Sequence, residues 1–217
     1  MRNRPFAGKA LSLDLIRCHM SLTTLGLELP TDPRWVNIAE MNIGEILIDH
    51  AYCEQKAASS CISLIVQYFD KPQLIAVLTP IVAEEWGHFQ RVLKELHKRD
   101  IPLGRPRKDE YVNQLRSRLR RSINDYLEQM MDNLLMNALI EARSCERFKL
   151  LSEHIADDGL RKFYHELMIS EAGHYRSFIE LAETYVPAQR VRERWKEFLV
   201  EEAGIMQSLG LRSDRMH

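Results

Sequence analysis

Several features are missing from this 217-residue chain, and each absence excludes a class of protein. No run of apolar residues approaches the roughly 18 that a transmembrane helix requires, so we expect no membrane span. The formal net charge of −1 at pH 7 creates no overall field that would attract nucleic acid or an anionic membrane, so any such contact needs a local patch. A Gly-x-Gly-x-x-Gly fingerprint is also absent, which argues against a flavin or nicotinamide site in this chain.

Cysteine is scarce and scattered. The four cysteines are Cys18, Cys53, Cys61 and Cys145. None of them forms a Cys-x-x-Cys pair, which excludes a zinc ribbon and a rubredoxin-type iron site. Isolated thiols are typical of a reducing compartment, and the basic N-terminus lacks a secretion signal because Asp14 and Arg17 interrupt its apolar run. We therefore expect a cytoplasmic protein.

The composition favours helices. Glycine occupies only 9 positions and 45% of the residues are hydrophobic, which suits a helical globule. At this length we expect one domain over residues 1–217, with a core bundle over about 35–186. Apolar periodicity predicts long helices over 38–69, 72–98, 122–155 and 160–185, with peripheral helical segments over 11–23, 109–119 and 187–209. The linker over 100–108 would be the crossover of an all-α, ferritin-like four-helix bundle with additional peripheral helices.

Two Glu-x-x-His pairs are the most informative feature that is present. Each pair follows a lone helical glutamate by about 30 residues. The six residues are Glu54, Glu85 and His88 in the first half, and Glu141, Glu171 and His174 in the second. A glutamate and a histidine three residues apart lie on one face of a helix, so both side chains can reach one metal ion. Four carboxylates and two imidazoles in this order match the ligand set of a dinuclear metal site in a four-helix bundle.

The positions of the six residues relative to the turns strengthen this interpretation. Turns are expected at 70–72 and 157–159, where Asp, Pro and Gly cluster. Each candidate ligand lies about 20–24 Å from its turn at the rise of an α-helix. In two antiparallel hairpins the six groups would therefore meet at one depth. A weak duplication at an offset of about 86 residues supports two similar hairpins. The alternative is six unrelated surface or capping residues.

The chemistry of the donor set favours iron. Carboxylates and imidazoles hold Fe(II) or Mn(II) and leave coordination positions open. We assign Glu54, Glu85 and His88 to one metal and Glu141, Glu171 and His174 to the other. Of these, Glu85 and Glu171 are the expected bridges. The absence of cysteine from the set argues against zinc and against an iron–sulfur cluster. The prediction is two iron ions per chain, with manganese as the second choice.

Some residues beside the expected ligands have two interpretations each. Gly87 and Gly173 immediately precede the histidines, and glycine inside a helix costs about 1 kcal/mol relative to alanine. They either leave room near the metals for oxygen or substrate, or allow close packing of helices. Glu84 either accepts a hydrogen bond from a ligating imidazole or is solvated. His50, one turn before Glu54, either faces the site or is an ordinary core residue.

A basic segment over 105–121 is the second notable pattern. Its cations are Arg105, Arg107, Lys108, Arg116, Arg118, Arg120 and Arg121, against only Asp109 and Glu110. Such a cluster could contact phosphates, with Tyr111 available for base stacking. The alternative is a solvated helix face, which the near-zero net charge favours slightly when spacing alone is considered.

The flanking residues carry a resemblance to a known family. The segments Asp-His-Ala-Tyr-Cys-Glu-Gln-Lys-Ala (49–57), Glu-Glu-Trp-Gly-His-Phe (84–89) and Ser-Glu-Ala-Gly-His-Tyr (170–175) resemble the bacterial tRNA 2-methylthio-N6-isopentenyladenosine hydroxylases, within the ferritin-like dinuclear carboxylate proteins. The likeness extends over most of residues 35–205. It implies a non-haem diiron monooxygenase that uses O2 and two external electrons to hydroxylate the prenyl group of a tRNA adenosine. The six ligands would then be catalytic, and a phosphate contact by the basic segment becomes more credible.

The resemblance also implies partners. One is a tRNA that carries the prenylated adenosine, which has to leave its stack to reach a buried site. The other is a separate reductase or ferredoxin, because the chain has no nucleotide fingerprint of its own. The sequence carries no signal for the oligomeric state.

Three other functions remain open at this point. The chain could be a ferritin-like peroxide-reducing or iron-handling protein, although the lack of rubredoxin-type cysteines weakens that possibility. It could be a diiron hydroxylase of a small lipid-like substrate, with the arginines merely solvated. It could also be a helical scaffold around a purely structural metal.

Overall fold

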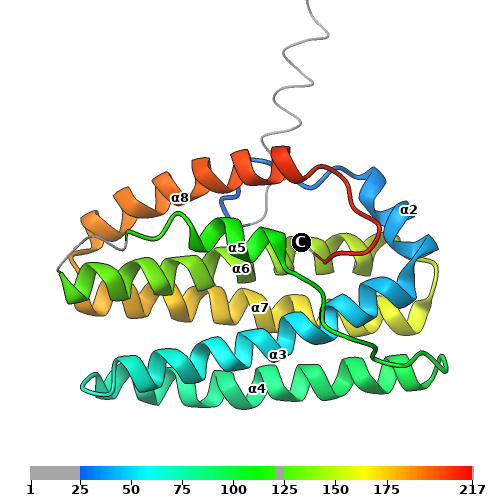
Figure 1. Ribbon diagram of the computed structural model, residues 1–217, viewed down its shortest axis with the longest axis horizontal. Helices are drawn as coiled ribbons and strands as arrows, with labels where there is room; N and C mark the ends of the chain where they lie inside the picture. Colours follow the sequence, from blue (N-terminus) through cyan, green and yellow to red (C-terminus); the bar gives the residue numbers. More distant parts are fainter. Residues whose placement is uncertain (1–24, 121–124, 217) are drawn as a thin grey trace, which may run out of the picture.

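In the computed structural model, residues 25–120 and 125–216 are described, and within these ranges all regular secondary structure is helical. The helices are α2 (Arg34–Met41), α3 (Ile43–Gln67), α4 (Pro72–His97), α5 (Glu110–Arg116), α6 (Tyr126–His154), α7 (Asp158–Tyr185) and α8 (Ala188–Leu209). The hairpins α3–α4 and α6–α7 form a four-helix bundle, with α5 and α8 beside α6 (Figure 1). The predicted all-α bundle with peripheral helices is therefore confirmed.

Residues that favour the start of a helix define the turns of both hairpins. Pro72 occupies the first turn of α4, where its missing N–H costs nothing. The Asp157 side chain accepts a hydrogen bond from the backbone N–H of Leu160 at 3.0 Å and so caps α7. Both predicted turns are thus confirmed.

Two predicted helix boundaries are wrong for identifiable reasons. The expected helix over 38–69 is interrupted at Asn42, which leaves α-helical geometry and donates its side-chain amide to the carbonyl of Ile38 at 2.8 Å. The third long helix begins at Tyr126 instead of 122, because Asp125 is extended and its carboxylate caps the helix. The helical segment expected over 11–23 lies outside the described residues.

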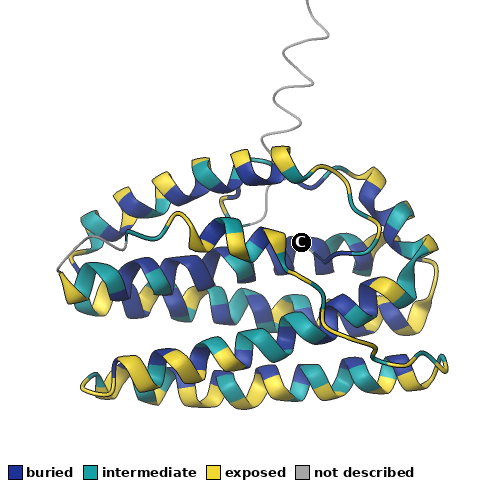
Figure 2. Ribbon diagram, viewed as in Figure 1, coloured by how far each residue is buried: buried dark blue, intermediate teal, exposed yellow. Residues whose placement is uncertain are grey.

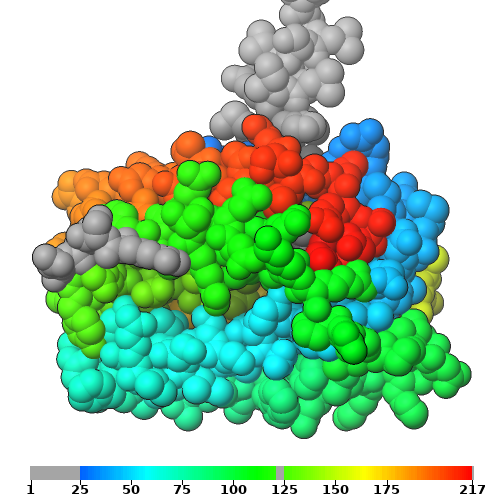
Figure 3. All heavy atoms as spheres, in the orientation of Figure 1, coloured from blue at the N-terminus to red at the C-terminus, as the bar shows by residue number. Residues whose placement is uncertain are grey.

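The linker between the hairpins runs along α3. A side chain at Gly44 would meet Ile101 at 3.0 Å, so glycine permits this close approach. The Tyr52 hydroxyl donates to the carbonyl of Gly104 at 2.7 Å. These contacts hold the predicted crossover against the first hairpin. The crossover leads into α5, which covers the side of the bundle between α3 and α6 (Figure 3).

The core consists of two apolar clusters with a polar layer between them. One cluster includes Leu64 and Leu78 near the α3–α4 turn. The other includes Trp35, Leu47 and Phe148 toward the opposite end of the bundle. Buried positions line the inner faces of the bundle helices (Figure 2). Each fully buried apolar side chain contributes about 1.5–3 kcal/mol, and the two clusters together hold the polar layer in place.

A buried ionic cluster attaches α8 to the bundle. The Arg143 guanidinium is fully buried and donates to both carboxylate oxygens of Glu202 at 2.8 Å. It also donates to Glu146, whose carboxylate accepts from the Thr31 hydroxyl at 2.7 Å. Such a cluster adds little net stability, but removal of one partner would leave a buried charge, so it fixes where α8 lies. Among the described helices, none has the length and apolar character needed to cross a membrane.

Candidate metal centre

The six residues singled out in the sequence meet in the polar layer. Glu54 comes from α3, the pair Glu85 and His88 from α4, Glu141 from α6, and the pair Glu171 and His174 from α7. Every one of them is at most 6% exposed. They form two overlapping groups, Glu54–Glu85–His88–Glu171 and Glu85–Glu141–Glu171–His174, with the ligand atoms of each group within 4.8 Å of one another. Only Glu85 and Glu171 belong to both groups, so these are the two carboxylates that could bridge a pair of metal ions.

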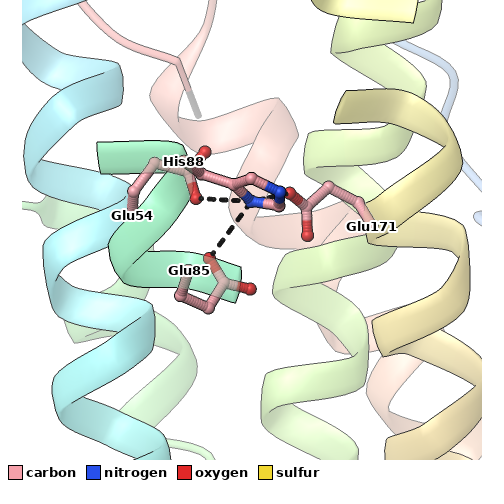
Figure 4. Close-up of side chains that lie close together, drawn as sticks. All are labelled: Glu54, Glu85, His88 and Glu171. Atoms are coloured by element: carbon pink, nitrogen blue, oxygen red, sulfur yellow. Dashed lines mark ion pairs between the residues drawn. The ribbon is translucent and has the colours of Figure 1, made fainter. Parts of the chain in front are cut away.

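Both imidazoles turn the same nitrogen inward. The Nδ1 atom of His88 lies 3.2 Å from Oε1 of Glu171, 3.6 Å from Oε2 of Glu54 and 3.8 Å from Oε2 of Glu85 (Figure 4). The Nδ1 atom of His174 lies 2.7 Å from Oε1 of Glu85 and 3.0 Å from Oε2 of Glu171. The ring centroids of His88 and His174 are 5.9 Å apart. Each ring therefore presents one nitrogen to the shared carboxylates.

The unsatisfied atoms of this layer fit a pair of metal ions. Both carboxylate oxygens of Glu85, Oε1 of Glu171 and Nδ1 of His88 are buried without a hydrogen bond of good geometry. Buried polar atoms are normally bonded, so such a concentration requires an explanation. Oxygen and imidazole donors without thiolate suit Fe(II) or Mn(II), which would satisfy these atoms.

Without a metal, protons balance the charge of the carboxylates. Burial and the neighbouring carboxylates of Glu171 and Glu54 raise the pKa of Glu85 to about 8. Burial, helped by Glu85 and Glu171, raises the pKa of Glu141 well above its usual range. Burial alone would lower the pKa of His88, but its carboxylate partners raise it to about 12. A metal would have to displace these protons, because it binds the deprotonated ligands.

Two further side chains hold the ligands in orientation. The Nε2 atom of His174 lies 2.8 Å from Oε2 of Glu84, so Nδ1, which faces the shared carboxylates, is the nitrogen that could bind a metal. The Nε2 atom of His50 lies 2.6 Å from Oε1 of Glu54. Burial lowers the pKa of His50 to about 3, so its neutral ring donates to that carboxylate. His50 is thus both a fully buried core residue and a partner of the site.

The two glycines beside the histidines do not serve close packing. A Cβ atom built on Gly87 or Gly173 would meet nothing within 4 Å. The packing interpretation is therefore wrong, because no neighbouring helix approaches either glycine closely.

A cavity of about 100 Å³ adjoins the site between α3, α5 and α6. Glu141 is the one candidate ligand that lines it. Its remaining lining is apolar at Cys53, Ala57, Val112, Met136 and Ile140, and polar at Lys56, Ser60, Asp109, Asn113, Arg116 and Asn137. The sequence did not predict this cavity, because its walls come from three helices whose mutual placement has no local signal. Of the lining residues, only Arg116 belongs to the cations predicted to contact phosphates.

The basic segment divides into paired and unpaired cations. Arg107 bonds Glu45 and Arg120 bonds Asp132, so both have structural roles. Tyr111 is 1% exposed and donates to Glu202 at 3.2 Å, so the prediction that it could stack on a base is wrong. The cations that are exposed and have no acidic partner among the described residues are Arg105, Lys108, Arg116 and Arg118. Arg121 lies outside the described residues.

The bundle and its buried layer of glutamate and histidine define the class as ferritin-like. A solved structure, protein 43 with aldehyde deformylating oxygenase activity from Synechococcus, superimposes with a TM-score of 0.83 at 35% identity, over 88% of this chain and 94% of that one. The predicted ferritin-like fold is thereby confirmed.

Within this class the family is also identified. The model of the tRNA-(MS[2]IO[6]A)-hydroxylase (MiaE) family matches residues 20–217, and the chain belongs to that family. A tRNA 2-(methylsulfanyl)-N(6)-isopentenyladenosine(37) hydroxylase of Pseudomonas putida is 40% identical over 73% of this chain and 76% of its own length. A protein of the same name from Salmonella typhimurium is 27% identical over 84% of each chain. The resemblance noted in the sequence is confirmed.

Proposed function

We propose that this protein is an O2-dependent, non-haem diiron monooxygenase that hydroxylates the isopentenyl group of 2-methylthio-N6-isopentenyladenosine in tRNA. The observation that carries the proposal is the convergence of six buried ligands with unsatisfied donor atoms in a chain of this family. Two iron ions, when bound by these ligands, would supply the activation of O2. In the balanced reaction, the C–H bond and O2 with two electrons and two protons would give an alcohol and water. No electron-carrying cofactor is indicated in the chain, so a separate donor would supply the electrons.

The cavity at Glu141 suits the reacting part of this substrate. One part of the wall of this cavity is apolar, at Ala57, Val112, Met136 and Ile140, so the prenyl chain could lie against it. Met136 and Ile140 would contact that chain next to Glu141. Arg116 also lines this cavity and has no acidic partner among the described residues, so it could contact a phosphate beside an extruded base, whereas Lys56 is bonded to Asp109. The protein would thereby present the prenyl group to the carboxylate side of the metal centre.

The test replaces one glutamate and one histidine of the candidate metal centre. Glu141→Ala and His174→Ala should each abolish dinuclear metal binding and oxygen insertion while circular dichroism still shows a helical protein. Activity would be measured by mass spectrometry of nucleosides from prenylated tRNA after incubation with iron, O2 and an electron donor. His154→Ala, an exposed histidine on α6, is the matched control. Full hydroxylation by either ligand variant would contradict the assignment of these residues.

A second candidate is an oxygenase that acts on a lipid-like aldehyde. The structural relative that is 35% identical carries aldehyde deformylating activity, which is the specific observation in its favour. Incubation with a long-chain aldehyde separates the two functions. Loss of the formyl group without any change in tRNA would favour this candidate. The unpaired Arg116 at the cavity argues for a phosphate-bearing substrate instead.

A further inference from the structure

The side of the bundle formed by α4 and α7 lies opposite the cavity. The two histidines come from α4 and α7, whereas the residues that line the cavity come from α3, α5 and α6 and from the residue before α5. Figure 1 shows α5 lying along α6, away from α4. We call the outer surface of α4 and α7 that extends from the two histidines to Lys94 and Lys162 the imidazole face. It is defined by Glu84, Trp86, Gly87, Gln90 and Lys94 of α4, and by Lys162, Ile169, Gly173 and Arg176 of α7. The substrate proposed above would therefore leave this face free.

Little protein separates the candidate metal ligands from solvent on this face. Glu84 is half exposed, with 54% of its side chain in solvent, and one hydrogen bond joins it to the Nε2 atom of His174. Gly87 and Gly173 add no side chain to this face, and the space that a Cβ would occupy is open. An electron arriving at this surface would therefore cross only one hydrogen bond and one imidazole ring to reach the ligand layer.

The imidazole face also has the chemistry of a protein-binding surface. Trp86 is 47% exposed and packs on Phe89 with ring centroids 4.9 Å apart, and Ile169 is 58% exposed. Large exposed apolar residues of this kind often anchor an interface. Lys94 and Lys162 are exposed on the same two helices, and neither has an acidic partner in the part of the chain that the structure describes.

We propose that the imidazole face is the docking surface for an acidic electron-carrier protein. This inference rests on the proposed function, because only that reaction requires two external electrons. The unpaired Lys94 and Lys162 share their helices with the exposed Trp86 and Ile169, and their charge would attract an acidic partner to this face. The same lysines could attract RNA, but the tRNA has to present its prenyl group to the cavity on the opposite side of the bundle. The geometry therefore favours a protein.

The test reverses charge on the face and compares two ways of reducing the protein. Lys94→Glu with Lys162→Glu would be assayed with a plant-type [2Fe–2S] ferredoxin and its NADPH-dependent reductase. The same variant would be reduced with dithionite, freed of reductant and given O2 for a single turnover on prenylated tRNA. Binding of the ferredoxin would be followed directly by calorimetry at several salt concentrations. The matched control is Arg192→Glu with Lys196→Glu, two exposed cations of α8 on the far side.

We expect the variant to raise the KM for ferredoxin about tenfold and to flatten the salt dependence of ferredoxin binding. The single turnover and the affinity for tRNA should match those of the unsubstituted protein, as should every property of the α8 control. The neutral pair Lys94→Gln and Lys162→Gln should show a smaller change of the same sign. Unchanged ferredoxin binding, weakened tRNA binding, or failure of ferredoxin to reduce the unsubstituted protein would each overturn the inference. The dithionite reaction reports separately on the proposed function, which fails if no oxygen is inserted.

Discussion

At the scale of single residues, the two halves of the site are alike in their ligands and different in their supports. His174 has the carboxylate of Glu84 as its outer partner at 2.8 Å. The corresponding position in the second hairpin, immediately before Glu171, is Ser170, for which the described structure shows no hydrogen bond to His88. A charged acceptor fixes the orientation of an imidazole and makes it a stronger ligand. The two metal positions should therefore differ in affinity.

Glu84→Ala should weaken the metal position at His174 by about 10–100-fold, as removal of such an acceptor typically does. Anaerobic titration with Co(II), followed by its visible absorption, would resolve the two sites without relying on activity. Glu84→Gln keeps an acceptor oxygen and should recover part of the affinity. Ser170→Ala is the control at the matching position and should leave both affinities unchanged. Equal weakening at both positions, or none, would show that Glu84 does not orient His174.

Gly87→Ala and Gly173→Ala separate helix stability from the need for space. A methyl group meets nothing at either position, so each change should stabilise the protein by about 0.5–1 kcal/mol, measured by urea unfolding. We also expect slower hydroxylation, because the methyl group would narrow a path by which O2, rather than the tRNA, could reach the metal centre from the α4–α7 side. Gly204 on α8 has equally open surroundings, so Gly204→Ala should raise the free energy of unfolding by a similar amount without slowing hydroxylation. Undiminished hydroxylation in the first two variants would show that the open space is not used.

At the scale of elements, α5 and the residues that follow it combine surface cations with structural ones. Arg116 and Arg118 are exposed and have no acidic partner among the described residues. Arg120 is different, because its guanidinium bonds Asp132, which is buried and also accepts from Arg194 at 3.0 Å. These interactions fix the end of the basic segment against α6 and α8. A charge pattern in the sequence therefore overstates how many cations are available to a ligand.

Arg116→Glu with Arg118→Glu should weaken tRNA binding and lower the slope of log affinity against log salt by about 1 for each phosphate that the protein no longer neutralises. Thermal unfolding should be unaffected, because neither residue forms an ion pair in the described structure. Arg120→Ala is the contrasting variant and should cost about 1.5–3 kcal/mol of stability, since it removes charged hydrogen bonds from a buried aspartate. An unchanged salt slope in the double variant would make the segment a solvated surface only.

At the scale of the whole molecule, metal binding and folding should be coupled. The six ligands lie between the two apolar clusters, with carboxylates from all four helices of the bundle. No subset of two helices supplies both groups, so the site exists only in the assembled bundle. A metal that binds the folded chain and not the unfolded one stabilises by about 2.7 kcal/mol per site at 100 times its dissociation constant.

Calorimetry should therefore show a melting temperature that is about 5–10 °C higher per occupied site for Mn(II)-loaded protein than for protein in a chelator. The increase should be larger at pH 8 than at pH 6. Protons compete with the metal at Glu85, whose pKa is raised to about 8, and at His88, so loading weakens as the pH falls. Glu141→Ala should abolish most of the increase. Equal melting temperatures with Mn(II) and with chelator at both pH values would argue against a metal site that spans the bundle.

The candidate ligands and the general fold could be predicted from the sequence, because the signals that encode them are local. A spacing of three residues places Glu85 with His88, and turn residues such as Pro72 set how far along each helix a ligand lies. Repetition of the same arrangement in the second half then brings six groups to one depth. The domain boundaries and the metal itself stay predictions.

Only the tertiary structure decided which neighbours act on those ligands. The interactions between Glu84 and His174, and between Arg143 and Glu202, join residues far apart in the sequence. Periodicity shows which face of a helix is buried, but it does not show which side chain of another helix lies opposite. The same limit applies to the cavity at Glu141 and to the pairing of Arg120, because both depend on how α5 rests on the bundle. The sequence determined the candidate ligands, and the packing of helices determined what surrounds them.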